Sequence, residues 1–279
     1  MQSRRLPVYF LSHGGGPWPW VAPMRQGLAV TAREFAALPA RLPGRPKAIL
    51  MISGHWECRE FTVSTAERPP MEYDYSGFPE HTYHIRYPAP GAPWLAGQVS
   101  ELLASAGVPT GADPSRGFDH GVFVPLSLMY PDADIPVVML SMKSDYDAAE
   151  HIRIGAALAP LRDEGVLIIG SGLTYHNMRN FGGDESLTVS TAFERFLATA
   201  IAHESPAMRN AMLAAWETAP MARRAHPRED HLLPLMVVAG AAQEDPGRTL
   251  FVDQFMKIAM ASYEFGVNAG HAGTARSDE

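Results

Sequence analysis

The hydrophobic positions of this chain gather into four short runs, at residues 7–12, 47–53, 136–142 and 166–170. Apolar runs of this length, bounded by glycine, proline or small polar residues, predict buried strands. The runs do not alternate between polar and apolar positions, which is typical of a largely parallel sheet that is covered on both faces. They therefore predict the centre of such a sheet.

Amphipathic patterns typical of helices separate and follow these runs. They lie at 31–40, 93–106, 146–161, 187–203 and 206–216, and the segments 233–243 and 250–262 close the fold. Thr31 with Glu34 three residues later matches a helix capping box. Alternating strands and helices predict an α/β fold. We expect a single layered domain over 1–279, with a largely parallel or mixed central sheet flanked by helices and a flexible tail at 267–279.

Three of the four runs end in a similar way. The first reaches Ser12 and His13, the second reaches Ser53, Gly54 and His55, and the fourth reaches Ser171 and Gly172 with His176 four residues further on. In layered α/β folds, ligands bind beyond the carboxyl ends of the strands. The sequence therefore predicts that three strands direct histidines toward one common site.

Composition and charge narrow the class of protein. The net charge is −7 and the basic residues are scattered, which argues against nucleic acid or an anionic membrane as a partner. One cysteine, Cys58, cannot form an intrachain disulfide and favours a reducing compartment. No apolar stretch approaches the ~18 residues that a membrane span needs. We expect a cytoplasmic protein, and the sequence does not indicate its oligomeric state.

Five of the eleven histidines lie beside glycine or proline at the border of an apolar run: His13, His55, His120, His176 and His231. One such residue would mean little, but five favour a metal site or an acid–base cluster. His226 is a competitor of His231. Residues five apart on a helix point about 140° apart, so the two do not easily share one ligand. Pro227 also moves His226 away from helical geometry, and we choose His231.

Six motifs occur in a characteristic order along the chain. They are SHGGGPWPW at 12–20, SGHWE at 53–57, YDYSGFP at 73–79, FDHGVFVPL at 118–126, GSGLTYHNMR at 170–179 and HPREDHLLPL at 226–235. Over most of residues 7–265 the chain resembles the class III extradiol catechol dioxygenases, specifically the DOPA 4,5-dioxygenase-like branch. The motifs are specific as a set, although GHW or DHG alone would be weak.

The resemblance implies a single-domain α/β enzyme that uses non-haem iron(II) for activity, with zinc(II) in some purified preparations. Such an enzyme inserts both atoms of O2 beside the paired hydroxyls of a catechol and opens the ring to a muconic semialdehyde. Carried over by position, the metal ligands are His13, His55 and His231. The acid–base histidine is His176, and a further active-site histidine is His120.

This assignment suits the chemistry of a six-coordinate metal. Three protein ligands leave two positions for a catechol and one for O2, so the other two histidines remain free for proton transfer. The residues leave alternatives open. A resting zinc form could take His176 as its fourth ligand, and a carboxylate, Glu229 or Asp230, could join the shell.

Substrate contacts and rival functions complete the expectations. The aromatic segment 73–79 is a candidate cover for the substrate, with Tyr75 as a binding residue, although it could equally be a packed surface loop. Arg179 could pair with a substrate carboxylate or hold a structural salt bridge. The rivals are a zinc hydrolase that activates water at the same histidines, and a non-catalytic metal-binding or interaction protein on the same scaffold.

Overall fold

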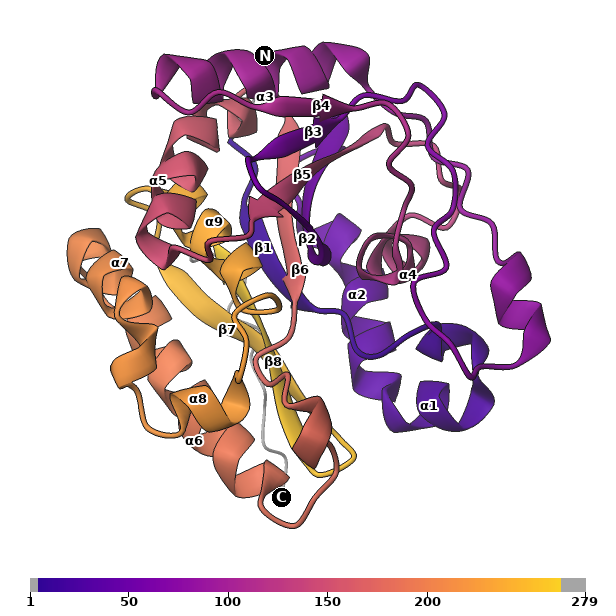
Figure 1. Ribbon diagram of the computed structural model, residues 1–279, viewed down its shortest axis with the longest axis vertical. Coiled ribbons are helices and arrows are strands. Elements are labelled where there is room, and N and C mark those ends of the chain that lie inside the picture. Colours follow the sequence, from indigo (N-terminus) through magenta and orange to yellow (C-terminus); the bar gives the residue numbers. More distant parts are fainter. Residues whose placement is uncertain (1–4, 267–279) are drawn as a thin grey trace.

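The four predicted strands form the middle of an eight-stranded sheet in the computed structural model, which describes residues 5–266 (Figure 1). They are β1 (Val8–Ser12), β2 (Ala48–Cys58), β5 (Val137–Lys143) and β6 (Val166–Gly172). They lie in the order β5, β2, β6, β1, and each pairs in parallel with the next. Their carboxyl ends therefore meet at one edge, as the sequence predicts.

Short or antiparallel strands extend the sheet on both sides. They are β3 (Thr62–Ser64), β4 (Gly111–Asp113), β7 (Gly247–Phe255) and β8 (Ile258–Phe265), and the complete order is β4-β3-β5-β2-β6-β1-β8-β7. The sheet is mixed, because β8 runs antiparallel to β1 and β3 antiparallel to β5. The prediction that the closing segment 250–262 is helical is wrong, because this segment belongs to the β7–β8 hairpin.

Helices cover both faces of the sheet. On one side lie α3 (Pro93–Ser105), α5 (Ala148–Leu158), α6 (Ser186–Ile201), α7 (Pro206–Ala214), α8 (Ala222–Ala225) and α9 (Leu233–Ala242); on the other lie α1 (Ala22–Gly27), α2 (Ala29–Arg41) and α4 (His120–Met129) (Figure 1). Short 3-10 turns are η1 (Trp18–Trp20), η2 (Glu80–His84), η3 (Ala159–Arg162), η4 (Met178–Asn180) and η5 (Trp216–Thr218). The layering confirms the predicted α/β class.

The predicted capping box at the start of α2 is wrong. The helix begins at Ala29, so Thr31 lies inside its first turn. Its backbone N–H and its hydroxyl both donate to Asp253 on β7, over 2.9 and 2.7 Å. A carboxylate from the far end of the chain therefore satisfies one free N–H group of this helix terminus, in place of a local side chain.

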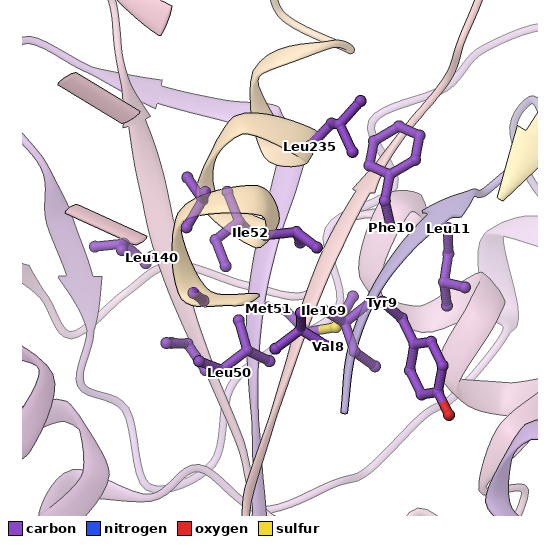
Figure 2. Packing of buried hydrophobic residues seen from close by; sticks show 14 of the residues in the cluster. Val8, Tyr9, Phe10, Leu11, Leu50, Met51, Ile52, Leu140, Ile169 and Leu235 are labelled. Atoms are coloured by element: carbon purple, nitrogen blue, oxygen red, sulfur yellow. The ribbon is translucent and has the colours of Figure 1, made fainter. Parts of the chain in front are cut away.

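The core lies where the central strands meet the helices. Side chains of β1, β2, β5 and β6 point to both faces and are buried, and Leu235 of α9 packs over them (Figure 2). Trp56 of β2 is buried as well. Within 5–266 no helix combines the length and the apolar character needed to cross a membrane. The tail predicted at 267–279 lies outside the described residues.

Candidate metal centre

A row of small residues closes the carboxyl edge of the central strands. Ser12 on β1 lies opposite Gly172 on β6, and Ser53 on β2 lies opposite Ser171. His13 follows Ser12 directly. Because these strands are parallel neighbours, their ends bring side chains from distant parts of the sequence to one place.

The second strand does not stop at the Ser-Gly pair, as its pattern suggests. β2 continues to Cys58, and its register against β5 shifts between Ile52 and Glu57. Such an irregularity re-aims side chains at the end of a sheet. His55 lies within it and is thereby directed to the same edge as His13.

His231 reaches this edge from the segment that precedes α9. Its carbonyl accepts a hydrogen bond from the N–H of Leu173, over 3.0 Å. A Cβ on Gly172 would lie 2.1 Å from that carbonyl oxygen. Only glycine permits this close approach, so Gly172 is a condition for the placement of His231.

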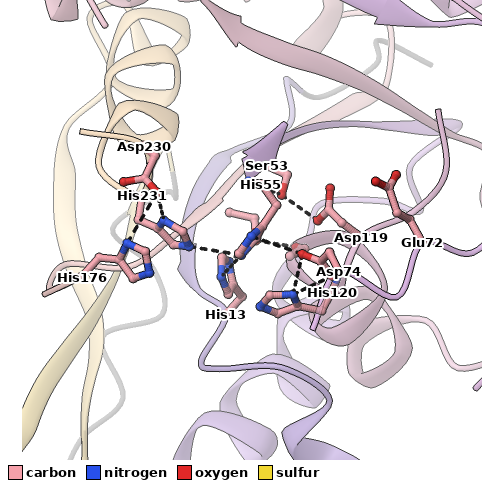
Figure 3. Close-up of polar contacts among 12 residues, drawn as sticks. His13, Ser53, His55, Glu72, Asp74, Asp119, His120, His176, Asp230 and His231 are labelled. Carbon is pink, nitrogen blue, oxygen red and sulfur yellow. Dashed lines mark hydrogen bonds and ion pairs between the residues drawn. The ribbon is translucent and has the colours of Figure 1, made fainter. Parts of the chain in front are cut away.

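The ring nitrogens of these three histidines converge. The Nε2 atom of His55 lies 3.1 Å from Nε2 of His13 and 3.1 Å from Nε2 of His231 (Figure 3). Two nitrogens bound about 2.1 Å from one metal at adjacent positions lie roughly 3 Å apart. The spacing is therefore that of neighbouring ligands on one ion.

The opposite nitrogen of each ring has a partner that fixes its proton. Nδ1 of His13 lies 2.9 Å from Ser171 Oγ, whose own proton goes to the carbonyl of Gly121. Nδ1 of His55 lies 3.2 Å from Asp74, and Nδ1 of His231 lies 2.9 Å from Asp230. These partners accept, so each Nδ1 carries the hydrogen and each Nε2 a lone pair. Lone pairs facing one another repel unless a cation lies between them, which is the arrangement of a metal site.

The surroundings keep these rings neutral. Burial, followed by the neighbouring histidines, holds the pKa of His13 and of His231 well below the usual range. For His55, burial and His120 outweigh two nearby carboxylates and lower the pKa to about 4. Neutral imidazoles do not have to lose a proton before they bind a metal.

His120 lies beside this cluster at the start of α4. Its Nδ1 donates to both oxygens of Asp74, over 2.9 and 2.8 Å, and its backbone N–H also donates to Asp74, over 3.1 Å. Its ring lies 4.0 Å from that of His55, centroid to centroid. Although burial opposes it, these hydrogen bonds lower the pKa of Asp74 to about 2. The carboxylate is therefore ionised and accepts only.

His176 lies on the opposite side of the cluster. Its ring stacks on His231, with centroids 3.4 Å apart and planes at 26°. Its Nδ1 lies 3.5 Å from Asp230, too far for a direct hydrogen bond. Although burial opposes it, contacts with His176 and His231 hold the pKa of Asp230 below its usual range.

All five predicted histidines thus meet in one cluster. It comprises two groups. Within each group, the potential ligand atoms all lie within 4.8 Å of one another. The first group is His13, His55 and His120, and the second is His176, Asp230 and His231. The contact between His55 and His231 joins them. Asp230 was a candidate ligand and is placed in the second group, whereas Glu229, the other candidate, pairs with Arg223.

The two predicted substrate residues differ in their surroundings. The ring of Tyr75 lies 6.0 Å from that of His120, but its hydroxyl donates to the carbonyl of Thr82 and so is used within its own segment. Arg179 is exposed on η4, three residues beyond His176. Tyr75 can thus offer a ring face, while Arg179 offers its charge at the surface.

Sequence reasoning missed the residues that orient the rings. Ser171 and Asp74 stood within quoted motifs, yet neither was chosen. A serine at a strand end gives no signal of its own. An aspartate between two tyrosines could have been noticed, because a carboxylate beside histidines commonly fixes their orientation.

Comparison with known proteins identifies relatives over almost the whole chain. Residues 8–269 match the family described as the catalytic LigB subunit of aromatic ring-opening dioxygenase. The chain is 44% identical over 205 residues to the 4,5-DOPA dioxygenase extradiol of Beta vulgaris, covering 72% of this chain and 75% of that one. It is 36% identical over 273 residues to the protein of that name in Escherichia coli K12, covering 95% and 97%.

Two further matches agree with these. The dioxygenase tasH of Hapsidospora irregularis is 36% identical over 276 residues, which cover 93% of this chain and 85% of that one. The crystal structure of an uncharacterized protein from Escherichia coli K12 superposes with a TM-score of 0.77 at 33% identity, covering 94% of this chain and all of that one. The chain therefore shares its fold with a solved bacterial protein and its sequence with named dioxygenases.

Proposed function

The chain belongs to the family of the catalytic LigB subunit of aromatic ring-opening dioxygenases, and from this premise we propose how its residues carry out the reaction. It is an extradiol dioxygenase, and its relatives include enzymes named 4,5-DOPA dioxygenase extradiol. This membership favours ring opening with O2 over the zinc hydrolase and the non-catalytic binding protein that the residues alone leave open.

We propose that His13, His55 and His231 bind the metal, and that iron(II) is the active form, with zinc(II) able to occupy the same ligands. One observation supports this set above all: the three Nε2 atoms converge, while each Nδ1 lies 2.9–3.2 Å from a side-chain oxygen. When bound, the metal supplies Lewis acidity and redox chemistry that favour an anionic catechol and its reaction with O2.

We assign proton transfer to His176. Its side chain is 19% exposed and has no tight hydrogen bond to Asp230, so the ring can accept the second hydroxyl proton of a catechol and return it later. An imidazole suits both steps because its ordinary pKa lies near neutral pH. His120, held by Asp74, offers its Nε2 to a substrate or dioxygen atom.

We propose that the substrate is a catechol with an acidic substituent. Several relatives are named for DOPA, a catechol that carries an amino-acid side chain. The ring of Tyr75 provides an aromatic face beside His120, and the exposed Arg179 provides a cation for a carboxylate. Planar stacking and one ion pair would then orient the ring.

We further propose that one catalytic domain performs the whole reaction and that it works in the cytoplasm. The sheet that carries His13, His55 and His176 is continuous from β4 to β7, which supports a single unit. The single cysteine, Cys58, is free, which suits a reducing compartment.

Anaerobic reconstitution with iron(II), followed by oxygen-electrode measurements on a panel of catechols, tests the proposal. The iron-loaded protein should consume one O2 per catechol and form a product that absorbs in the near-visible, as a hydroxymuconic semialdehyde does. The zinc-loaded protein is the matched control and should consume none. A colourless cis,cis-muconate, or no oxygen uptake across the panel, would contradict extradiol cleavage at this site.

A further inference from the structure

Two carboxylates, Asp74 and Asp230, make parallel contacts on opposite sides of the cluster. Asp74 touches Nδ1 of His55 and of His120, at 3.2 and 2.8 Å (Figure 3). Asp230 touches Nδ1 of His231 and of His176, at 2.9 and 3.5 Å. Each carboxylate thus contacts one proposed metal ligand and one histidine assigned to the substrate chemistry.

We infer that Asp74 and Asp230 are paired positioning residues, each of which contacts one metal histidine and one catalytic histidine with the same carboxylate: Asp74 holds His120 by hydrogen bonds, whereas Asp230 holds His231 and only limits the position of His176. The inference rests on the proposed function, because it uses the roles given there to the five histidines. It adds that metal binding and substrate chemistry share their supporting groups. Asp74 also ties the aromatic segment 73–83 to the metal centre.

The tautomers of the rings that bond directly to these carboxylates follow from the contacts. An ionised carboxylate has no hydrogen to donate, so every Nδ1 that bonds to it must carry one. The free Nε2 atoms then lie on the side away from the carboxylates, toward the proposed metal position in His55 and His231 and toward the proposed substrate position in His120. Loss of Asp74 would remove a contact from two rings at once, and loss of Asp230 would release His231 and remove the carboxylate neighbour of His176.

The two carboxylates differ in how tightly they hold the catalytic ring. Asp74 binds His120 through both oxygens and also accepts from the His120 backbone N–H. Asp230 lies close to His231 but 3.5 Å from His176, and its Oδ1 is buried without a hydrogen-bond partner among residues 5–266. We therefore expect His120 to be fixed and His176 to have freedom to move.

Neighbouring acids provide matched controls. Glu72, two residues before Asp74, pairs with Arg116, and Glu229, next to Asp230, pairs with Arg223. Changing these to glutamine alters charge in the same segments without touching a carboxylate that contacts the histidines. A general effect of charge or loop stability would appear in the controls as well.

The test measures Zn²⁺ affinity of the apoprotein by chelator competition, and kcat of the iron-loaded protein. Asp74→Asn and Asp230→Asn should each lower Zn²⁺ affinity and kcat by about 10- to 100-fold, the usual effect of losing such a partner. Glu72→Gln and Glu229→Gln should change neither. Asp74→Glu, which keeps the charge, should recover part of both losses, and it replaces Asp74→Asn if that variant does not fold.

Double variants separate positioning from general structural damage. In a His120→Ala background, Asp74→Asn should still weaken Zn²⁺ binding through His55 but should lower kcat no further. In a His176→Ala background, Asp230→Asn should still weaken Zn²⁺ binding through His231 and should lower kcat no further. Equal losses of kcat with and without the catalytic histidine, or no loss of Zn²⁺ affinity in either aspartate variant, would overturn the inference. An unaltered protein that binds no metal or consumes no O2 would instead refute the proposed function.

Discussion

His226 and His231 lie five residues apart in one segment, are both buried, and have opposite surroundings. His226 packs against Phe193 and Trp216, and within 5–266 neither of its ring nitrogens makes a hydrogen bond of good geometry. Burial, followed by the nearby His176, lowers its pKa to about 3, although the backbone of Thr174 opposes this shift. His231 has a carboxylate at Nδ1 and another imidazole at Nε2.

The difference teaches what marks a functional histidine in this protein. Burial and a lowered pKa belong to both residues and so decide nothing. What distinguishes His231 is that its Nδ1 is bound to the carboxylate of Asp230, while its Nε2 faces Nε2 of His55. Four predictions probe this distinction, from the largest expected effect to the smallest.

Loss of a converging ring should abolish metal binding. His13→Ala, His55→Ala and His231→Ala should each lower metal affinity by more than the roughly 10- to 100-fold expected for an outer partner. His226→Leu should keep its metal, because its ring takes no part in the convergence. Metal analysis of the four purified proteins checks this, and full occupancy in all three alanine variants would refute the ligand set.

Loss of His176 should affect turnover and spare the metal. His176→Ala should bind metal and catechol as before, while turnover falls roughly 100- to 10,000-fold, the usual contribution of one positioned acid–base group. Anaerobic catechol titration and oxygen uptake measure the two properties separately. If the variant lost its metal, His176 would belong among the ligands.

Loss of Arg179 should affect only acidic substrates. An exposed ion pair is worth about 0.2–1 kcal/mol, so Arg179→Gln should raise KM for a carboxylate-bearing catechol by roughly 2- to 5-fold. KM for unsubstituted catechol should not change. Steady-state kinetics on the two substrates measure this, with unsubstituted catechol as the control. An equal rise in KM for both substrates would exclude a carboxylate contact.

The smallest effect on turnover should come from His226, whose influence is on stability. Its folded pKa lies near 3 and the unfolded value near 6.5. Between these two pH values the unfolded chain binds a proton at His226 and the folded chain does not. The contribution of His226 to the free energy of unfolding is therefore complete above pH 6.5 and is lost as the pH falls toward 3. Urea unfolding of the apoprotein at pH 7 and pH 5.5 should show a weaker pH dependence in His226→Leu. An unchanged dependence would contradict the buried, neutral ring.

The parts of the site that lie on parallel strands could be predicted from the sequence. Apolar runs located β1, β2 and β6, and parallel pairing places their ends together, which is why His13 and His55 could be chosen. The choice of His231 over His226 relied on local geometry next to Pro227. That reasoning agrees with the placement of the two rings, although the ligand role of His231 stays a prediction.

Other features depend on contacts that no local pattern encodes. The capping prediction failed because Asp253, more than two hundred residues away, bonds to Thr31. Asp74 could not be assigned because its role depends on how its segment lies against α4. The extension of β2 past Ser53 depends on an irregular register with β5, and small polar residues give no sign of that.

The central position of β1 has a consequence for the order of events during synthesis. This strand, the first to leave the ribosome, pairs with β6 and β8, which come from the second half of the chain. Roughly 150 residues separate it from β6, and at about 5–20 residues per second they take on the order of 8–30 s to make. His13 is therefore synthesised long before β6, the parallel neighbour of the strand that precedes it. His231 emerges later still, so a centre that needs all three proposed ligands can be completed only after β1 to β6 have been synthesised.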